Sequence, residues 1–223
     1  MTTAESMSAT PAVSDLLADT PVIAVVDIVD VSVATELAIV LADAGITVLE
    51  VTLRSPVAMA ALGLAAESGA LCVGAGTVIS TEQARAVVER GAQFLVSPGL
   101  SHDVQNEATE LGVPYLPGVL TPTEMQGALD MNITEVKLFP VQHFGGLDLV
   151  NTCAAVFGGL TFIPSGGMTH DRAAGYLSHP QVAAVGGSWI APPSDLQHRN
   201  WAAIARRAEA VVALSADLRS LTP

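Results

Sequence analysis

Residues 49–54 read Leu-Glu-Val-Thr-Leu-Arg, a strand-like stretch in which apolar and polar side chains alternate strictly. In an extended chain this period of two puts the leucine and valine side chains on one face and Glu50, Thr52 and Arg54 on the other. In a barrel of parallel strands the outer face packs on helices, so the polar face points into the lumen. The stretch therefore predicts a barrel whose interior carries an acid and a cation.

Units of the same kind recur along the whole chain. Apolar strand-like runs alternate with amphipathic helical patterns about every 21 to 26 residues, with short connections between them. Over 223 residues this alternation predicts an α/β protein, a (β/α)8 TIM barrel with an N-terminal helical extension. The eight expected strands are residues 21–28, 47–53, 71–78, 93–98, 114–119, 135–140, 161–165 and 182–190.

Helical patterns fill the intervals between these strands, for example over residues 31–44, 81–90, 103–111 and 201–214. Ser80 and Ser101 are expected to cap two of these helices at their N-termini. An open, doubly wound sheet is the alternative fold. Residues 73–77, Val-Gly-Ala-Gly-Thr, match a dinucleotide-binding fingerprint only in part, because Ile79 stands at the third glycine position and no acidic ribose-binding residue follows correctly. Dinucleotide binding is therefore excluded.

The expected domain organisation is one barrel domain over residues 21–223, preceded by an extension over residues 1–20. Within the extension a helix around Val13 to Ala18 is expected to close the barrel bottom. Residues 1–20 hold no basic residue, and the chain has no run of about eighteen apolar residues, which argues against export and membrane insertion. We expect a cytoplasmic protein in which Cys72 and Cys153 are reduced, inert thiols.

The net charge of −13 bears on the partners of the chain. Neither nucleic acid nor an anionic membrane would find a basic stripe to bind, so both are excluded as partners. An anionic substrate could be held only by locally positive groups, and the chain supplies one lysine and eight arginines.

The single lysine, Lys137, lies in an apolar run, Thr-Glu-Val-Lys-Leu-Phe-Pro, at residues 134–140. A central strand would bury its ammonium group, and lysine is almost never fully buried without a partner. One interpretation is a lysine at the strand end whose amine reaches water. The other is a desolvated amine that acts as a nucleophile toward carbonyl groups.

Glu50, Arg54 and Lys137 are expected to share the barrel interior. A buried ion-pair network that only fixes packing is one explanation. Such networks stabilise weakly compared with apolar replacements, whereas titratable groups at a barrel mouth are what catalysis requires. The sequence therefore favours a catalytic site.

Six motifs on successive expected strands make a family resemblance specific. Together they resemble the 2-keto-3-deoxy-6-phosphogluconate (KDPG) aldolases and their 4-hydroxy-2-oxoglutarate (KHG) aldolase relatives, over about residues 21 to 190. The motifs are Leu-Glu-Val-Thr-Leu-Arg at 49–54, Val-Gly-Ala-Gly-Thr-Val at 73–78, Val-Ser-Pro-Gly at 96–99, Lys-Leu-Phe-Pro at 137–140, Pro-Ser-Gly-Gly at 164–167 and Gly-Gly-Ser-Trp at 186–189.

The resemblance implies a class I aldolase that needs neither a metal nor a cofactor and that forms a homotrimer. It implies that Lys137 forms the Schiff base and that Glu50 is the general acid and base. The remaining residues that it assigns are Arg54 and Thr77 for the pyruvyl carboxylate, with Pro98 and Phe139 lining the pocket.

The residue types suit this chemistry independently. Cleaving a carbon–carbon bond beta to a ketone leaves a carbanion, and a protonated imine on Lys137 would delocalise that charge. Glu50 would take the proton of the C4 hydroxyl and then serve the later proton transfers. Arg54 can hold a carboxylate with two parallel hydrogen bonds, as a lysine could not.

A phosphate site is expected after the last two strands. Gly166 and Gly167 follow the seventh strand, and Gly187 and Ser188 follow the eighth, where barrels commonly bind phosphate through backbone N–H groups. Taken singly, each glycine pair is a tight turn. Two pairs on adjacent strands, in so acidic a chain, favour a phosphate site for a small keto-acid phosphate substrate.

Two positions depart from the resemblance. Ser165 stands where many members of the family have threonine, which leaves the choice between gluconate- and galactonate-derived substrates open. Asp27 stands where some members have a basic residue, which argues against an additional anion contact there. The histidines show no metal-ligand spacing, so no metal site is expected.

The sequence thus predicts an enzyme that splits 2-dehydro-3-deoxy-6-phosphogluconate into pyruvate and glyceraldehyde 3-phosphate. Within the same class, the substrate could instead be the galactonate epimer or unphosphorylated 4-hydroxy-2-oxoglutarate. A phosphate-binding barrel isomerase would use Glu50 as its base without needing Lys137. A sugar-phosphate binding barrel would bind ligand and catalyse nothing.

Overall fold

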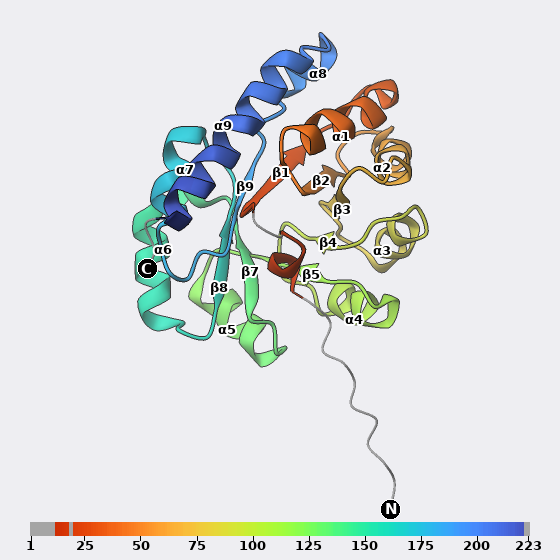
Figure 1. The fold of residues 1–223 in the computed structure, drawn as a ribbon. Coiled ribbons are helices and arrows are strands. Elements are labelled where there is room, and N and C mark those ends of the chain that lie inside the picture. Colours follow the sequence, from red (N-terminus) through yellow and green to blue (C-terminus); the bar gives the residue numbers. More distant parts are fainter. Residues whose placement is uncertain (1–11, 18–19, 221–223) are drawn as a thin grey trace, which may run out of the picture.

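The fold is an alternation of parallel strands and helices, seen in a computed structural model that describes residues 12–17 and 20–220. Figure 1 shows the strands gathered at the centre with the helices around them. All strand pairings are parallel, as the alternating pattern predicts. The strands are β1 (Val22–Val26), β2 (Val48–Thr52), β3 (Cys72–Gly76), β4 (Leu95–Val96), β5 (Tyr115–Leu116), β6 (Gly118–Val119), β7 (Glu135–Leu138), β8 (Thr161–Pro164) and β9 (Val185–Gly187).

The helices begin where the sequence offers capping residues. The hydroxyls of Ser80 and Ser101 accept hydrogen bonds from backbone N–H groups of the first turns of α3 and α4, which confirms both expected caps. The α-helices are α1 (Ala34–Asp43), α2 (Ala58–Glu67), α3 (Thr81–Val88), α4 (His102–Leu111), α5 (Pro122–Asp130), α6 (Leu147–Val156), α7 (His170–Leu177), α8 (Pro193–Gln197) and α9 (Trp201–Ser220). Three short 3-10 helices are η1 (Val13–Leu16), η2 (Val31–Val33) and η3 (Val141–Phe144).

The strands form two parallel sheets, with the orders β5-β4-β3-β2-β1-β9 and β6-β7-β8. Two isolated bridges, Phe162 with Val182 and Ser165 with Gly186, link the ends of the two sheets. The chain is thus an α/β protein whose parallel sheet forms a half-barrel.

The fifth expected strand, residues 114–119, is broken in two. Pro117 separates β5 from β6, and β5 pairs with β4 while β6 pairs with β7. A proline has no N–H to donate to a strand ladder, so it interrupts the pairing where it stands. Its carbonyl oxygen still accepts the N–H of Lys137 at 2.8 Å, so the break lies against the strand that carries the lysine.

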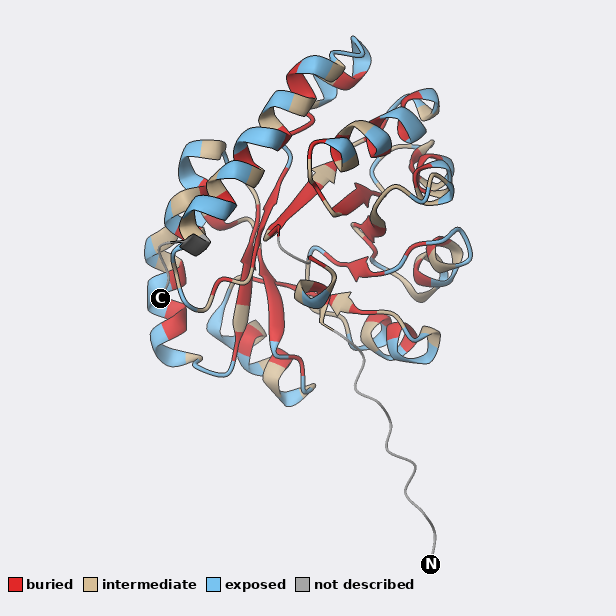
Figure 2. Ribbon diagram, in the orientation of Figure 1, coloured by how far each residue is buried: buried red, intermediate tan, exposed pale blue. Residues whose placement is uncertain are grey.

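Burial follows the alternation of side chains along each strand. In Figure 2 the strands are almost entirely buried, and the helices are exposed on their outer faces. Leu49 and Val51 pack outward in the large apolar cluster with the helices, whereas Val48 packs in a smaller cluster that includes Phe94 and Ile163. The opposite face of β2 is therefore free to carry Glu50 and Thr52 inward.

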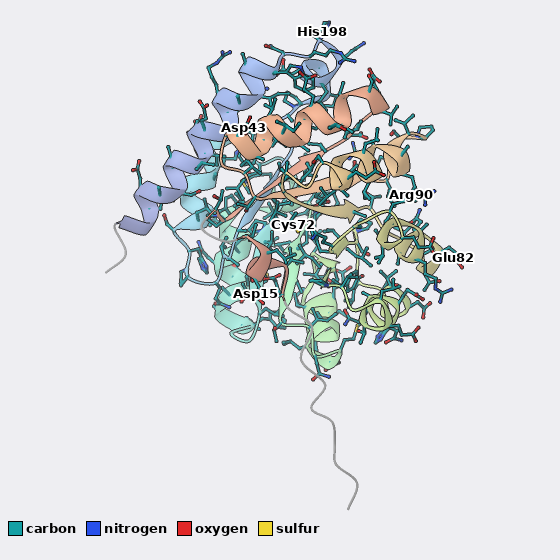
Figure 3. All side chains as sticks on the ribbon, turned by 45° about the vertical axis from the view of Figure 1, so that its right-hand side comes forward. Asp15, Asp43, Cys72, Glu82, Arg90 and His198 are labelled. Atoms are coloured by element: carbon teal, nitrogen blue, oxygen red, sulfur yellow. The ribbon has the colours of Figure 1, made fainter. Side chains whose placement is uncertain are left out.

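The N-terminal helix expected around Val13 to Ala18 is a single 3-10 turn, η1, and Ala18 lies outside the described residues. Figure 3 labels Asp15 on this turn. Val13 and Leu17 are buried in the smaller apolar cluster. The backbone N–H of Ser14 donates to both carboxylate oxygens of Glu135, at 3.1 and 3.3 Å. The turn therefore packs against the interior of the sheet at the start of β7.

Several charged side chains lie on the outer surface. Glu82, Arg90 and His198, all labelled in Figure 3, are exposed on the helices and the turns that follow them. Among the described residues, no helix is both long enough and apolar enough to cross a membrane.

Candidate active site

Lys137 and Glu50 form a buried ion pair between β7 and β2. The Lys137 amine donates to the two carboxylate oxygens of Glu50, at 2.9 and 3.2 Å. Lys137 is only 7% exposed and Glu50 only 2%. The lysine is therefore not a strand-end residue with its amine in water, and the acid and the lysine share one interior as the alternation predicts. An ion pair this deeply buried stabilises a fold poorly for its cost, which points to a chemical role.

Neighbouring groups leave the Glu50 carboxylate little freedom. A side chain at Gly76, on the adjacent strand β3, would overlap Oε1 of Glu50, so the glycine makes the space in which the carboxylate lies. Thr52 is turned the same way, and its hydroxyl donates to the Val26 carbonyl at 3.0 Å. The Lys137 amine also lies 5.5 Å from the centre of the Phe139 ring, within the range of a cation–π contact. The pair is thus held by three strands and one aromatic ring.

A cavity of about 160 Å³ opens above this pair. Ten of the eleven site residues predicted from the sequence line it: Lys137, Glu50, Arg54, Thr77, Pro98, Phe139, Ser165, Gly166, Gly167 and Ser188. Four further residues complete the lining, Val25, Thr52, Met168 and Gly186. Strand alternation identifies Thr52 from the sequence, whereas the other three carry no distinctive polar signal.

Gly187 is the predicted residue that does not line the cavity. A side chain there would overlap the ring of Trp189, whereas one on Gly186 would meet the Ser165 hydroxyl at 3.0 Å. Successive residues of a strand face opposite ways, so Gly186 takes the cavity side and Gly187 the other. The glycine pair still brings the backbone close to the cavity, through its first member.

The other expected glycine pair forms a tight turn after β8. Gly166 and Gly167 have φ angles of 90° and 75°, in the left-handed region that glycine adopts without strain. A Cβ on Gly166 would lie 2.9 Å from Cα of Pro140, so this turn packs against the end of β7. Arg172, on the first turn of α7, donates to the carbonyl of Gly167 at 2.9 Å. The turn is thus fixed from two sides beside the cavity.

Arg54 lies at the rim of the cavity and has a partner within the chain. Its Nη2 atom donates to Oδ2 of Asp27 at 2.8 Å. The side chain of Arg54 is 60% exposed and that of Asp27 is 24% exposed. The sequence did not predict this contact, although Asp27 and Arg54 both follow adjacent strands.

Larger hollows lie elsewhere on the molecule, but the one that borders a cysteine offers no reactive group. A hollow of about 670 Å³ borders Cys72 and Arg90, both labelled in Figure 3, near the start of β3. Burial raises the pKa of the Cys72 thiol to about 11, so the thiol stays protonated and unreactive at neutral pH. In the part of the chain that the structure describes, no three His, Cys, Asp or Glu side chains are grouped so as to hold a metal ion. The Lys137 cavity is therefore the candidate active site.

Comparison with known proteins identifies the family of this chain. Residues 13–207 match the family described as KDPG and KHG aldolase. A 2-dehydro-3-deoxy-phosphogluconate aldolase of Zymomonas mobilis is 37% identical over 190 residues, which cover 85% of this chain and 91% of the relative. A KHG/KDPG aldolase of Escherichia coli is 35% identical over 198 residues, 88% of this chain and 93% of the relative.

A solved structure gives the same result in three dimensions. The KDPG aldolase of Legionella pneumophila, captured with pyruvate as a covalent carbinolamine intermediate, superposes with a TM-score of 0.85 at 38% identity. The match covers 89% of this chain and 97% of that one. With the sequence match over most of its length, a shared fold and a buried lysine–glutamate pair, this chain belongs to the KDPG and KHG aldolase family.

Proposed function

We propose that this chain is a class I aldolase that cleaves 2-dehydro-3-deoxy-6-phosphogluconate to pyruvate and glyceraldehyde 3-phosphate through a Schiff base on Lys137. The observation that carries the proposal is the contact of 2.9 Å between the only lysine and a buried carboxylate at the base of a cavity. A carboxylate at this distance can take a proton from the ammonium group and leave a nucleophilic amine.

The proposed reaction begins at the C2 ketone of the substrate. The Lys137 amine adds to C2, and Glu50 returns its proton to the hydroxyl of the resulting carbinolamine, which leaves as water and gives a protonated imine. Glu50 then takes the proton of the C4 hydroxyl, the C3–C4 bond breaks, and its electron pair moves into the imine to give an enamine. Protonation of the enamine at C3 and addition of water to the imine release pyruvate and restore the amine.

Four residues are proposed to hold the pyruvyl part of the substrate. Arg54 and Thr77 take its carboxylate, and Pro98 and Phe139 line the sides of the pocket. All four border the Lys137 cavity, which supports the assignment. Thr77 has a φ of 63°, an uncommon backbone conformation for a non-glycine residue and one that occurs preferentially at functional sites.

The phosphate is proposed to bind at the turn after β8 and at the end of β9. Gly166, Gly167, Gly187 and Ser188 would supply backbone N–H groups and one hydroxyl, with Ser165 between them and the lysine. Glycines let the backbone approach an anion closely, and hydrogen bonds from N–H groups suit phosphate in a chain with few cations.

An additional activity toward unphosphorylated 4-hydroxy-2-oxoglutarate is the second candidate, favoured by the relative of E. coli, whose name includes both substrates.

We also infer a complete (β/α)8 barrel formed as one domain by residues 21–223, with residues 1–20 as an N-terminal extension. The two isolated bridges that link the ends of the two sheets support closure at one seam, and the single residue Pro117 between β5 and β6 supports it at the other. The proposal includes a cytoplasmic homotrimer. Exposed apolar side chains such as Phe144 and Val156 offer surface for contacts between subunits, and analytical ultracentrifugation tests the subunit number.

Reductive trapping tests the mechanism directly. Incubation with pyruvate and borohydride should add one reduced pyruvyl group per chain, and peptide mass spectrometry should locate it on Lys137. The N-terminal amine is the only competing amine, so the Lys137→Arg variant is the matched control and should remain unmodified inside the barrel.

Two results would contradict this function. An unmodified Lys137 at saturating pyruvate would exclude the Schiff base and leave an isomerase or a binding protein. Loss of cleavage activity in EDTA, restored by a divalent cation, would show that the enzyme depends on a metal.

A further inference from the structure

Asp27 and Arg54 meet at the ends of two adjacent strands. Val26 of β1 pairs with Val51 of β2, so the residues that follow these strands emerge side by side. Asp27 comes directly after β1, and its Oδ2 atom accepts a hydrogen bond from Nη2 of Arg54 at 2.8 Å. Arg54 borders the Lys137 cavity, so Asp27 holds a cation at the edge of the active site.

The atom that Asp27 contacts matters for binding a second carboxylate. A guanidinium group can hold a carboxylate with two parallel hydrogen bonds along either of two edges, and Nη2 belongs to both. Elsewhere in this chain Arg85 holds Glu107 in this way, through Nε at 2.7 Å and Nη2 at 2.6 Å. Asp27 therefore contacts a nitrogen that a substrate carboxylate held by two parallel hydrogen bonds would also use on Arg54.

The second carboxylate oxygen of Asp27 makes the contact with Arg54 more important for the stability of the aspartate. Oδ1 is buried and has no hydrogen-bond partner among the described residues. A buried carboxylate oxygen without a partner is costly, so the contact with Arg54 supplies compensation that Asp27 does not obtain elsewhere in the described structure. A substrate that draws Arg54 toward itself leaves Asp27 less well compensated.

Charges around the cavity are consequently balanced before the substrate arrives. Lys137 is paired with Glu50, and Arg54 with Asp27, so the two cations that border the cavity each face an acid. An incoming carboxylate thus meets a pair with no net charge rather than a free cation. Like charges close together repel, which weakens the complex.

We propose that Asp27 tunes the affinity of the site for pyruvate by competing with the pyruvyl carboxylate for Arg54. It weakens the hold of the site on pyruvate and so promotes release of this product, while keeping Arg54 at the rim. This inference rests on the proposed role of Arg54 in carboxylate binding.

The test compares Asp27→Asn with the unmodified protein. Asparagine keeps the shape and an oxygen that can accept from Arg54, but it removes the competing charge. The pyruvate concentration that half-saturates borohydride trapping of Lys137 should fall roughly 1.5- to 5-fold, the range expected for a partly exposed charge pair. The inhibition constant of pyruvate against cleavage should fall by the same factor.

A neutral ligand separates competition from a change of shape. Pyruvamide has the carbonyl group of pyruvate but no carboxylate, so its half-saturating concentration should be the same in both proteins. Added salt should reduce the difference between the two proteins with pyruvate, because salt screens exposed charges. A variant that had lost its structure would trap neither ligand.

Asp30→Asn is the matched control. Asp30 lies on the same loop and accepts from Ser32, and the substitution removes the same charge without touching Arg54. It should leave the pyruvate concentration for half-saturation unchanged. An Asp27→Asn variant that needs as much pyruvate as the unmodified protein, or more, overturns the competition. An equal shift of the half-saturating concentration with pyruvamide also overturns the competition.

Failure of the unmodified protein to trap pyruvate at all would instead refute the Schiff-base function.

Discussion

The Glu50 carboxylate lies where a side chain of residue 76 would be, because a methyl group on Gly76 would overlap the Oε1 atom of Glu50. The two residues lie on the adjacent strands β2 and β3, with Gly76 paired to Thr52 and both side-chain positions turned to the cavity. The glycine therefore sets the position of the proposed general base, although it touches no substrate itself.

Gly76→Ala should displace the Glu50 carboxylate from the Lys137 amine. We expect kcat to fall by roughly 10² to 10⁴, the usual contribution of acid–base catalysis. We also expect a loss of about 1 to 3 kcal/mol in the free energy of unfolding, because the site is overpacked. Steady-state kinetics and urea denaturation measure the two effects. Gly158→Ala is the control, since a Cβ there meets no atom within 4 Å. A fully active Gly76→Ala variant would mean that Glu50 needs no fixed position.

Glu50→Gln tests the carboxylate directly. The amide keeps the shape and hydrogen-bonding capacity but cannot take a proton, so kcat should fall by roughly 10² to 10⁴. Glu135→Gln is the matched control, because it makes the same exchange in another buried carboxylate of the chain, away from the cavity lining. Near-normal turnover in the Glu50 variant would place the base elsewhere.

Ser188→Glu should discriminate between substrates. A carboxylate beside the proposed phosphate site repels a phosphate, so kcat/KM for the phosphorylated substrate should fall far more than for 4-hydroxy-2-oxoglutarate, roughly 10-fold or more in the ratio. The ratio of the two constants is the quantity to measure, since damage to folding lowers both alike. Ser188→Gln adds the same bulk without charge and should change the ratio much less. If glutamate leaves the ratio unaltered, the phosphate binds at another place.

Glu135 should make the stability of the protein depend on pH. Burial raises the pKa of its carboxyl group above the ordinary 4.5, despite the hydrogen bonds from Ser14. The folded protein therefore binds this proton more tightly than the unfolded chain does. As the pH falls through the folded pKa toward 4.5, the unmodified protein should gain free energy of unfolding relative to Glu135→Gln, and the gain should level off below 4.5.

Urea denaturation of both proteins at several pH values measures this difference. The other carboxylates are present in both proteins, so their contributions cancel. A difference that stays constant between neutral pH and pH 4 would contradict a raised pKa for Glu135.

Much of the site could be predicted from the alternation of side chains along two strands. The alternation in residues 49–54 predicts that Glu50 and Thr52 face inward, and the position of Lys137 in an apolar run favours burial. The structure places all three residues at the same cavity. These predictions worked because a period of two is a geometric property of any strand, whatever its neighbours are.

Other features depend on contacts between distant residues and could not be predicted. The sequence predicts Gly187 at the phosphate site, but it does not predict that the strand turns the side-chain position of Gly186, and not that of Gly187, toward the cavity. The pairing of Asp27 with Arg54 arises from the register of β1 and β2, which no local pattern contains. The fifth strand breaks at Pro117, where the residue lacks a backbone donor, and this signal is present in the sequence itself.

Because Lys137 is the single lysine of the sequence, the nitrogen proposed to form the Schiff base can be labelled selectively. Protein grown with nitrogen-15 lysine would carry the isotope in a single side chain. Nuclear magnetic resonance of that one nitrogen would follow ammonium, amine and imine in turn, without any overlapping signal from the rest of the molecule.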